Sequence, residues 1–254
     1  PEQYKLIKRL IRTLAILIVP VALAIHTVTS WLFASTPRVG WDSTIFGPYY
    51  VSGAFVAGAA AVLVAMYIFS RNFKLKEYIT NMHFDKMAKL LVLLMMVYLY
   101  FNINEYLVPG YKMKSGDDIH LHELFKGHYA VLFWFVQIGG LILPIILLLF
   151  KPMRKPIPAM IIGLAVVLGA FFKRIIITVP TLVHPHLPIQ NVPNEFHTYW
   201  PTGVEWFITF LAISGAVLII TILSKLFPVM PIWEVAQEEG ISNEEINEFV
   251  QENE

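Results

Sequence analysis

HTVTSWLFASTPRVGWDSTIFGPYYVSG, residues 26–53, contains the pattern that recurs along the whole chain. An apolar segment that carries His26 ends in a loop with Trp41 and Asp42, and apolar sequence resumes behind two adjacent tyrosines. Trp and Tyr rings are enriched at the headgroup boundary of a bilayer, and ionisable groups at or below that boundary seldom lack a use. The stretch therefore predicts the exit of one membrane helix, an interfacial loop and the entry of the next helix.

The composition excludes an ordinary soluble domain. Of the 254 residues, 57% are hydrophobic and only 15% are charged, which leaves too little polar surface to cover a soluble protein. The chain has no cysteine, so it cannot itself ligate an iron–sulfur cluster through thiolates or attach a c-type haem. Any redox centre must be bound non-covalently or belong to a partner, and we expect no nucleic-acid partner.

Six apolar segments are long enough to cross the hydrocarbon core, which needs about 20 helical residues. They lie near residues 10–34, 48–70, 86–108, 127–150, 157–180 and 203–227. The segments lack the period-two alternation of barrel strands, and lipid admits only helices or closed barrels. The predicted fold class is therefore all-α, a polytopic membrane bundle with six transmembrane helices.

The orientation follows from Lys and Arg, which are concentrated in the N-terminal flank and in the second and fourth connections. By the positive-inside rule both termini are predicted to be cytoplasmic. The predicted outer loops are residues 35–47, 109–126 and 181–202. The predicted regions are a basic cytoplasmic flank (1–9), the six-helix transmembrane domain (10–227) and an acidic cytoplasmic tail (228–254).

The polar residues of the predicted spans gather in one layer toward the outer face. Tyr98, Asn102 and Glu105 have i, i+4 and i+7 spacing, so they form one stripe on their helix. The candidate proton-relay residues are His26, Asp42, Glu105 and Glu205. The candidate residues of a quinone site or proton path are His26, Tyr49, Tyr50, Asn104, His128, Lys173 and Arg174.

Structural alternatives stay open for several of these residues. His26 is also compatible with a hydrogen-bonded structural histidine, and Lys173 and Arg174 with snorkelling or with a structural pair to a glutamate. The H-x-H motifs at 120–122 and 184–186 are a weak metal signal because they lack a carboxylate or thiolate at fixed spacing. We predict no metal ligand in the chain.

Four stretches carry a family resemblance: HTVTSWLFA, PRVGWDSTIFGPYYVSGAFVAG, YLYFNINEYLVPGY, and YWPTGVEWFITF followed by FPVMPIWEV. With them the chain resembles the NrfD/polysulfide-reductase (PsrC-like) membrane-subunit family, above all the members in alternative complex III and the DsrP subunit of sulfate-reducer complexes. Larger members have about ten spans around two four-helix bundles. A six-span chain is similar to the C-terminal part of such a protein, and the family's usual quinone pocket belongs to the first bundle.

The resemblance implies a membrane subunit of a respiratory complex in the cytoplasmic membrane of a prokaryote. Such a subunit exchanges electrons and protons between menaquinone or another quinone, bound non-covalently, and a ferredoxin-like iron–sulfur subunit on the outer face. A multihaem cytochrome c and other membrane subunits are further partners that the resemblance implies. It also implies that this chain holds no haem or iron–sulfur cluster and is not an enzyme on its own.

Other functions remain open from the residues alone. A structural anchor or a proton-conducting subunit without its own quinone site fits the same spans. A cytochrome b would need paired axial histidines at matching depth, for which His26 and His128 are the candidates. A secondary transporter would explain the intramembrane charges, but we see no convincing inverted repeat.

Overall fold

The computed structural model describes residues 2–73, 75–114, 116–184, 193 and 199–226, with side chains from residue 6 onward. Within these ranges every regular element is a helix. The chain divides into two units, Pro1–Tyr199 and Trp200–Glu254, and each is described by itself. The predicted acidic tail at 228–254 lies outside the described residues, as do two positions of the second H-x-H motif.

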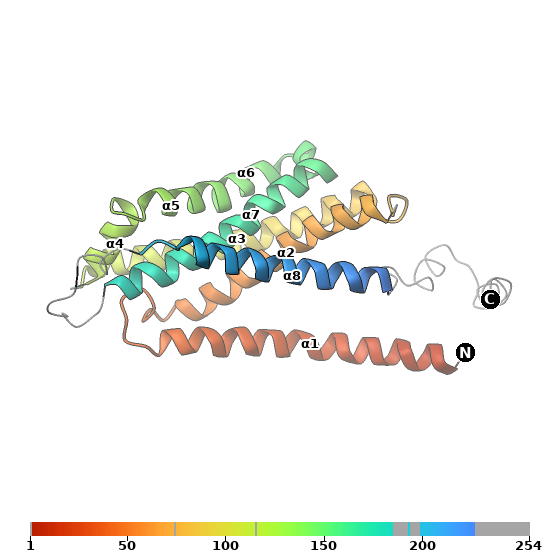
Figure 1. Ribbon diagram of the computed structural model, residues 1–254, viewed down its shortest axis with the longest axis horizontal. Helices are drawn as coiled ribbons and strands as arrows, with labels where there is room; N and C mark the ends of the chain where they lie inside the picture. The colour runs from red at the N-terminus through yellow and green to blue at the C-terminus, as the bar shows by residue number, and fades with distance from the viewer. Residues whose placement is uncertain (1, 74, 115, 185–192, 194–198, 227–254) are drawn as a thin grey trace. The chain divides into compact units, whose positions relative to one another are not determined.

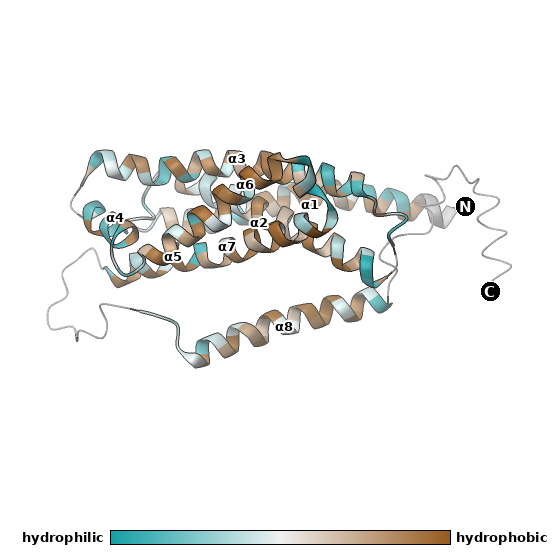
Figure 2. Ribbon diagram, turned by 90° about the horizontal axis from the view of Figure 1, so that it is seen from above, coloured by the Kyte–Doolittle hydropathy of each residue, from teal (hydrophilic) through white to brown (hydrophobic). Residues whose placement is uncertain are grey.

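The described helices match the predicted spans closely. The long ones are α1 (Glu2–Ala34), α2 (Phe46–Asn72), α3 (Asn81–Lys112), α7 (Pro156–Val183) and, in the second unit, α8 (Gly203–Leu226). The fourth predicted span consists of α5 (Ala130–Trp134), the π-helix η1 (Phe135–Ile142) and α6 (Leu143–Leu149). Six helical stretches in the described ranges are long and apolar enough to cross a membrane, as Figures 1 and 2 illustrate. The all-α, six-span fold class is confirmed.

The predicted outer loop at 109–126 is more helical than expected. α3 continues through Pro109 to Lys112 and ends where Met113 adopts a left-handed conformation (φ 45°). A further helix, α4 (Asp117–Phe125), follows with two aspartates in its first turn, where the positive end of the helix dipole stabilises negative charge. The two aspartates are visible in the sequence as a possible helix start, but the charged residues of this stretch had favoured a loop between two spans.

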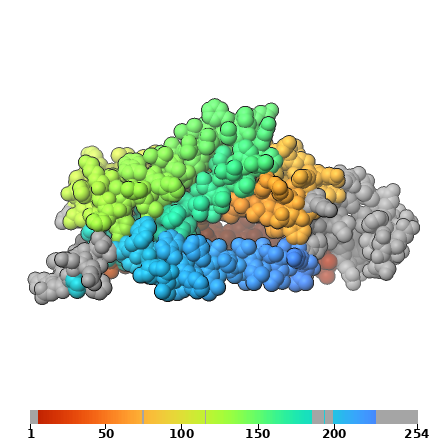
Figure 3. All heavy atoms as spheres, turned by 45° about the horizontal axis from the view of Figure 1, so that its top comes forward, coloured from red at the N-terminus to blue at the C-terminus, as the bar shows by residue number. Residues whose placement is uncertain are grey.

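The first unit packs around α2, which contacts α1, α3 and α7. Its main apolar core joins α2, α3, α6 and α7, and includes the fully buried Leu63, Leu91 and Leu148. Small residues allow the helices to approach closely, as is usual in membrane bundles. The closest approach is between Gly140 of η1 and Gly169 of α7, where a Cβ built on Gly140 would lie 2.8 Å from the Gly169 Cα. Figure 3 shows α4 to α7 as one continuous packed surface.

The π-helix precedes Pro144, the residue at which the sequence predicted a kink. Pro144 has no N–H to donate to the carbonyl four residues earlier, so it interrupts an α-helical ladder. The irregular stretch extends upstream of the proline for eight residues, and four of them (Val136, Gln137, Gly140 and Leu141) are buried. π-helical segments are rare and frequently occur at functional sites.

The loop after α1 folds back onto the bundle at what we call the Trp41 end. Trp41 is 6% exposed, and its indole Nε1 donates to the Ile177 carbonyl of α7 at 2.8 Å. Gly40 has φ +90° and lies so close to His120 and Thr181 that a side chain would not fit. The four aromatic residues of the stretch 26–53 that were expected at the headgroup boundary differ in exposure. Trp31 is exposed, Tyr50 is half-buried, and Trp41 and Tyr49 are buried.

Candidate functional site

A pocket lies between α2, α3, η1 and α7, and we call it the central pocket. Its empty space is about 620 Å³ with the open mouth included, and the part with room for water-sized molecules is about 60 Å³. One portion is apolar and lined by small residues, among them Gly53, Ala54 and Ala57. The polar portion is lined by Tyr49, Tyr50, Tyr98, Gln137, Lys173 and Arg174.

Lys173 is the buried cation of this pocket. It is 5% exposed, and its ammonium donates to Asn102 Oδ1 at 2.9 Å and to the Tyr106 hydroxyl at 2.8 Å. The ammonium also lies 4.9 Å from the Tyr106 ring centroid and 5.6 Å from that of Tyr49. A buried charge is costly unless it is hydrogen-bonded, and ring faces attract cations. These contacts explain how α7 tolerates a lysine inside the bundle.

The amides of Asn102 and Gln137 connect this lysine to the π-helix. Asn102 Nδ2 donates to Gln137 Oε1 at 2.9 Å, and Gln137 Nε2 donates to Asn102 Oδ1 at 3.4 Å. Asn102 is 5% and Gln137 6% exposed. The chain Lys173–Asn102–Gln137 therefore links α7, α3 and η1 through polar groups in an apolar interior.

Tyrosine rings form the wall on the α2 side. The rings of Tyr49 and Tyr98 are stacked with centroids 5.4 Å apart and planes 8° from parallel. The Tyr49 hydroxyl is buried and lies near that of Tyr98, but it makes no hydrogen bond of standard geometry. The Arg174 guanidinium lies 5.9 Å from the Tyr50 ring centroid. A buried hydroxyl without a partner has capacity for a ligand or water.

Glu105 lies one helical turn from Asn102, toward the Trp41 end, and is 7% exposed. Its carboxylate accepts a hydrogen bond from Ser43 Oγ at 2.7 Å, so the loop after α1 reaches the α3 stripe. Within the described residues no ion pair shorter than 4 Å joins Glu105 to Lys173. Lys173 and Glu105 therefore do not form a direct salt bridge.

A second, small cavity connects Glu105 with α4. It has about 20 Å³ of space and is lined by Glu105, Tyr49, Tyr106 and His120 among others. The His120 Nδ1 atom is buried without a hydrogen-bond partner, and burial, with His184 nearby, lowers the pKa of this imidazole to about 4. A cavity of this size holds one water molecule. That water would have polar neighbours in Glu105, Tyr49 and His120.

The structure brings together five of the predicted site residues. Tyr49, Tyr50, Lys173 and Arg174 line the central pocket, and Glu105 lines the adjoining cavity. Five polar residues of the central pocket and its hydrogen-bond network were not among the predicted site residues: Tyr98 and Asn102, which the sequence placed only on the α3 stripe, and Gln137, Tyr106 and Ser43. Gln137 could have been recognised as the single polar side chain in the middle of the fourth apolar span.

The other predicted residues lie elsewhere. His26 is half-buried on α1 and does not line either cavity. Asp42 and His128 are exposed near the Trp41 end. Asn104 bonds to the Tyr100 carbonyl of its own helix at 2.8 Å.

Glu205, which belongs to the second unit, takes part in the cap of α8. Its carboxylate accepts hydrogen bonds from the Thr202 backbone N–H at 2.6 Å and from the Thr202 hydroxyl at 2.8 Å. In return the Thr202 hydroxyl accepts from the Glu205 N–H at 3.4 Å. This reciprocal arrangement is a capping box, and it stabilises the start of the helix.

Six helices long and apolar enough to cross a membrane, with a buried polar network, indicate a multi-pass membrane protein with a pocket between its helices. Comparison with known families is more specific, because the family model described as "Polysulphide reductase, NrfD" matches residues 3–185. The chain belongs to the NrfD family, and the resemblance found in the sequence is confirmed.

The chain is also similar to one subunit of a known reductase. A selenate reductase subunit from Mesobacillus selenatarsenatis is 28% identical over 216 residues, which are 83% of this chain and 50% of the relative. The chain thus spans about half the length of the curated relative that it matches.

Proposed function

We propose that the chain is the membrane subunit of a respiratory reductase complex. In this role it exchanges electrons and protons between a membrane quinone or quinol and an iron–sulfur partner at the Trp41 end. The observation that carries the proposal is the Lys173 ammonium, held by Asn102 and Tyr106 at the polar end of a pocket with an apolar remainder. Membership of the NrfD family and the similarity to a reductase subunit support it.

The residues of the central pocket fit a quinone. A quinone presents two carbonyl acceptors on a flat ring and carries an apolar tail. The pocket offers donors at Lys173 and Arg174, an unpartnered hydroxyl at Tyr49, and a stacked pair of tyrosine rings. Its small residues on α2 leave a groove for the tail. The space with room for water-sized molecules, about 60 Å³, is smaller than a quinone ring, so the ring must also occupy the open mouth that the 620 Å³ includes.

The hydrogen-bond donors for the quinone carbonyls are the N–H groups of Lys173 and Arg174 that have no acceptor within the described chain. A lysine ammonium has three N–H donors, and Lys173 uses two of them on Asn102 and Tyr106. The third, together with the Arg174 guanidinium, is available for a carbonyl oxygen. A bound quinone would supply reversible electron transfer coupled to proton exchange. Lys173 and Arg174 orient the head group and stabilise negative charge on its oxygens.

The protons move through groups on the Trp41 side of the pocket. Glu105 lies between the central pocket and α4, and Ser43 and the small cavity connect it to the loops. A carboxyl group in this position can hold and release a proton on the path between the pocket and the outer side. Asp42, His26 and Glu205 remain predicted relay residues, and Asn104 and His128 remain predicted residues of the proton path.

The partner is assigned by chemistry. A cysteine-free chain needs an external electron carrier, and the relative is named as one subunit of a reductase. We therefore propose a ferredoxin-like iron–sulfur subunit docked on the Trp41 end, with a multihaem cytochrome c and further membrane subunits in the assembly. Because the chain spans half of its relative, a second quinone site in a preceding bundle is compatible with this proposal.

The test of the central pocket is Lys173→Met in the purified complex. Methionine keeps the length and apolar stem but removes the donors, so quinone affinity or quinone-linked turnover should fall ten-fold or more, about 1.4 kcal/mol or above. Lys86→Met, which changes an exposed lysine near the start of α3 and away from the Trp41 end, is the matched control. Arg174→Gln, which breaks no hydrogen bond within the described chain, reports on the same pocket if Lys173→Met fails to assemble.

Unchanged quinone binding and turnover in assembled Lys173→Met and Arg174→Gln complexes would contradict the proposed site. That result would favour the structural anchor, or a quinone site in sequence that precedes this chain.

The proton path has its own test in Glu105→Gln. Glutamine can still accept from Ser43 but cannot transfer a proton, so the complex should assemble while turnover slows about ten-fold or more, the scale of lost acid–base catalysis. Quinone affinity should stay near the wild-type value. His26→Ala is the companion variant for the predicted relay on α1, and wild-type turnover in both would remove these two residues from the path.

A further inference from the structure

A further open space in the described part of the chain lies away from the central pocket, at what we call the Arg154 end. It amounts to about 350 Å³ and is lined by Asn81, Met82, Asp85, Lys151, Arg154 and Lys155. These residues come from the start of α3, from the 3₁₀ turn η2 (Lys151–Arg154) and from the residue preceding α7. We call this space the basic pocket.

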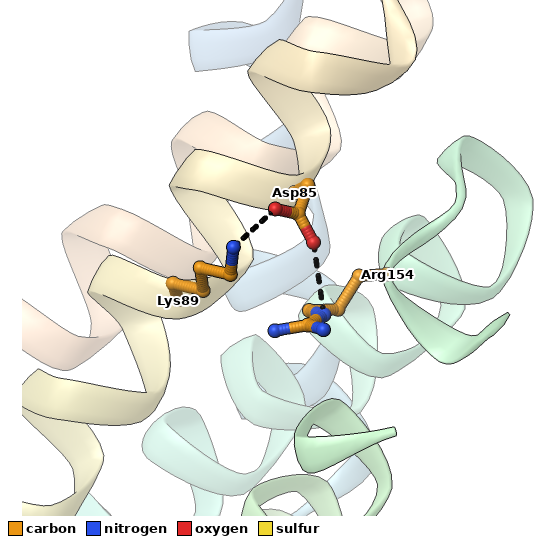
Figure 4. A network of polar contacts seen from close by, with 3 residues as sticks. All are labelled: Asp85, Lys89 and Arg154. Atoms are coloured by element: carbon orange, nitrogen blue, oxygen red, sulfur yellow. Dashed lines mark ion pairs between the residues drawn. The ribbon is translucent and has the colours of Figure 1, made fainter. Parts of the chain in front are cut away.

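One carboxylate orients the central cation of the basic pocket. Asp85 Oδ1 lies 3.0 Å from Arg154 Nε, and Asp85 Oδ2 lies 2.6 Å from Lys89 Nζ, as Figure 4 shows. The Arg154 side chain is only 15% exposed. No residue in the described ranges accepts a hydrogen bond from its two terminal nitrogens. They are therefore free to bind two oxygens of one anion in the fork geometry that arginine favours.

The remaining charges are positive. Lys151 and Lys155 are exposed and form no ion pair within the described residues. Together with Arg154 and Lys89 they place four cations around the single carboxylate of Asp85. The local excess is three positive charges, which selects for an anion. A cationic pocket of this kind between membrane helices is the usual site of a lipid phosphate.

The surroundings distinguish a lipid from a soluble anion. Large apolar side chains are exposed next to the basic pocket: Met82 is 54%, Phe150 59% and Ile157 55% exposed. They lie where α3 and α7 begin and α6 ends, so they belong to helical stretches that are long and apolar enough to cross a membrane. A soluble phosphate needs no such rim, whereas the acyl chains of a phospholipid would cover it.

We propose that the basic pocket binds the phosphate of an anionic phospholipid, with Arg154 as the bidentate donor and Lys151 and Lys155 as flanking charges. Asp85 is the positioning residue: its carboxylate forms an ion pair with Nε, which makes no hydrogen bond of standard geometry, and leaves the terminal nitrogens free. The acyl chains lie against Met82, Phe150 and Ile157. The site is independent of the quinone pocket, so it stands or fails separately from the proposed function.

The experiment uses the complete complex, purified in detergent and stripped of lipid. Phosphatidylglycerol, phosphatidylcholine and inorganic phosphate are added in separate arms. Retained lipid is measured by native mass spectrometry and stability by the thermal midpoint. We expect phosphatidylglycerol alone to bind and to raise the midpoint. The double variant Lys151→Gln/Lys155→Gln should weaken that binding ten-fold or more, since it removes two charges and leaves the Asp85–Arg154 pair intact.

The matched control is Lys112→Gln/Lys114→Gln, which removes two exposed lysines at the Trp41 end and should bind phosphatidylglycerol like the wild type. Three outcomes would overturn the proposal. Equal binding of phosphatidylcholine would mean that only the apolar rim matters. An equal effect of inorganic phosphate would identify a soluble-anion site. Undiminished phosphatidylglycerol binding in the Lys151/Lys155 double variant would exclude the pocket.

Discussion

Lys173 and Glu105 show how two ionisable side chains are held inside one bundle without a salt bridge. Lys173 is bound by an amide oxygen, a phenol and ring faces, whereas Glu105 is bound by a serine hydroxyl from a loop. Each group therefore has partners of its own. Because no hydrogen bond joins the two groups, a change of protonation at one leaves the hydrogen-bond partners of the other in place.

The sequence predicted part of this network for a physical reason. Tyr98, Asn102 and Glu105 have helical spacing, so their common face is a local property of α3. Ser43 could not be predicted to join Glu105, because the two residues are 62 positions apart and meet only when the loop after α1 folds back. His26 was predicted for the site and does not line it. The sequence indicates how far along α1 this residue lies, but not whether its side chain faces the pocket.

His120 makes a prediction about pH. Its folded pKa of about 4 is depressed below the ordinary 6.5 by burial, so the unfolded chain binds the proton more readily. Stability should be constant above about pH 6.5 and should fall as the pH drops toward 4, by about 3 kcal/mol at 1.36 kcal/mol per pKa unit. The measurement is the thermal midpoint of the purified protein at a series of pH values from about 7.5 to about 4, a range that includes the ordinary pKa of histidine.

His120→Phe should flatten this pH dependence. The control is His122→Phe, at an exposed position of the same helix, which should retain the wild-type curve. An equally steep loss of stability in His120→Phe would show that other groups cause it.

At the scale of elements, apolar length identified all six spans, because a bilayer demands about 20 apolar residues per helix. The irregularities were harder to predict. α4 is short and amphiphilic, and its Leu121 and Leu124 are buried by tertiary contacts that no local pattern indicates. The π-helix is also a tertiary outcome, although Pro144 marked its neighbourhood.

The contact between η1 and α7 predicts unequal effects for two adjacent glycines. A Cβ at position 140 would lie 2.8 Å from the Gly169 Cα, whereas one at 139 would meet only the Phe135 ring at 3.8 Å. Gly140→Ala should therefore destabilise the protein by about 1–3 kcal/mol, the usual cost of overpacking. Gly139→Ala should be neutral or slightly stabilising, because alanine favours helix over glycine.

Thermal unfolding of the two purified variants decides the matter. Equal midpoints would show that the two helices separate at no cost, and the central pocket, which both Gly140 and Gly169 line, would then be less well defined than described.

For the whole molecule, composition alone established the membrane class, but not which end faces which compartment. The Lys and Arg asymmetry predicts that the Arg154 end is cytoplasmic and the Trp41 end external. The basic residues of the fourth connection do lie together in η2 and beside it. Their position relative to a membrane remains a prediction.

Reporter fusions test the orientation. A reporter after Glu254 should be active as a cytoplasmic fusion, and one inserted next to Gly116, before α4, should be active only outside. The paired design carries its own control, since the two insertions must give opposite signals. The reverse result would move the iron–sulfur partner and the proton exit to the other side of the membrane.

The π-helix has a consequence for the phase of its span. Buried residues recur at every fourth position, along 133, 137, 141 and 145 and along 136, 140, 144 and 148. In a uniform α-helix each such step would drift by about 40°, so the buried face would wind away from α7. The wider π turns absorb that drift. A one-residue deletion within 135–142 would let the segment become α-helix with little change of phase. The eleven remaining steps would turn by about 1,100°, close to the three full turns that now separate 133 from 145, so the buried face of the span should be kept.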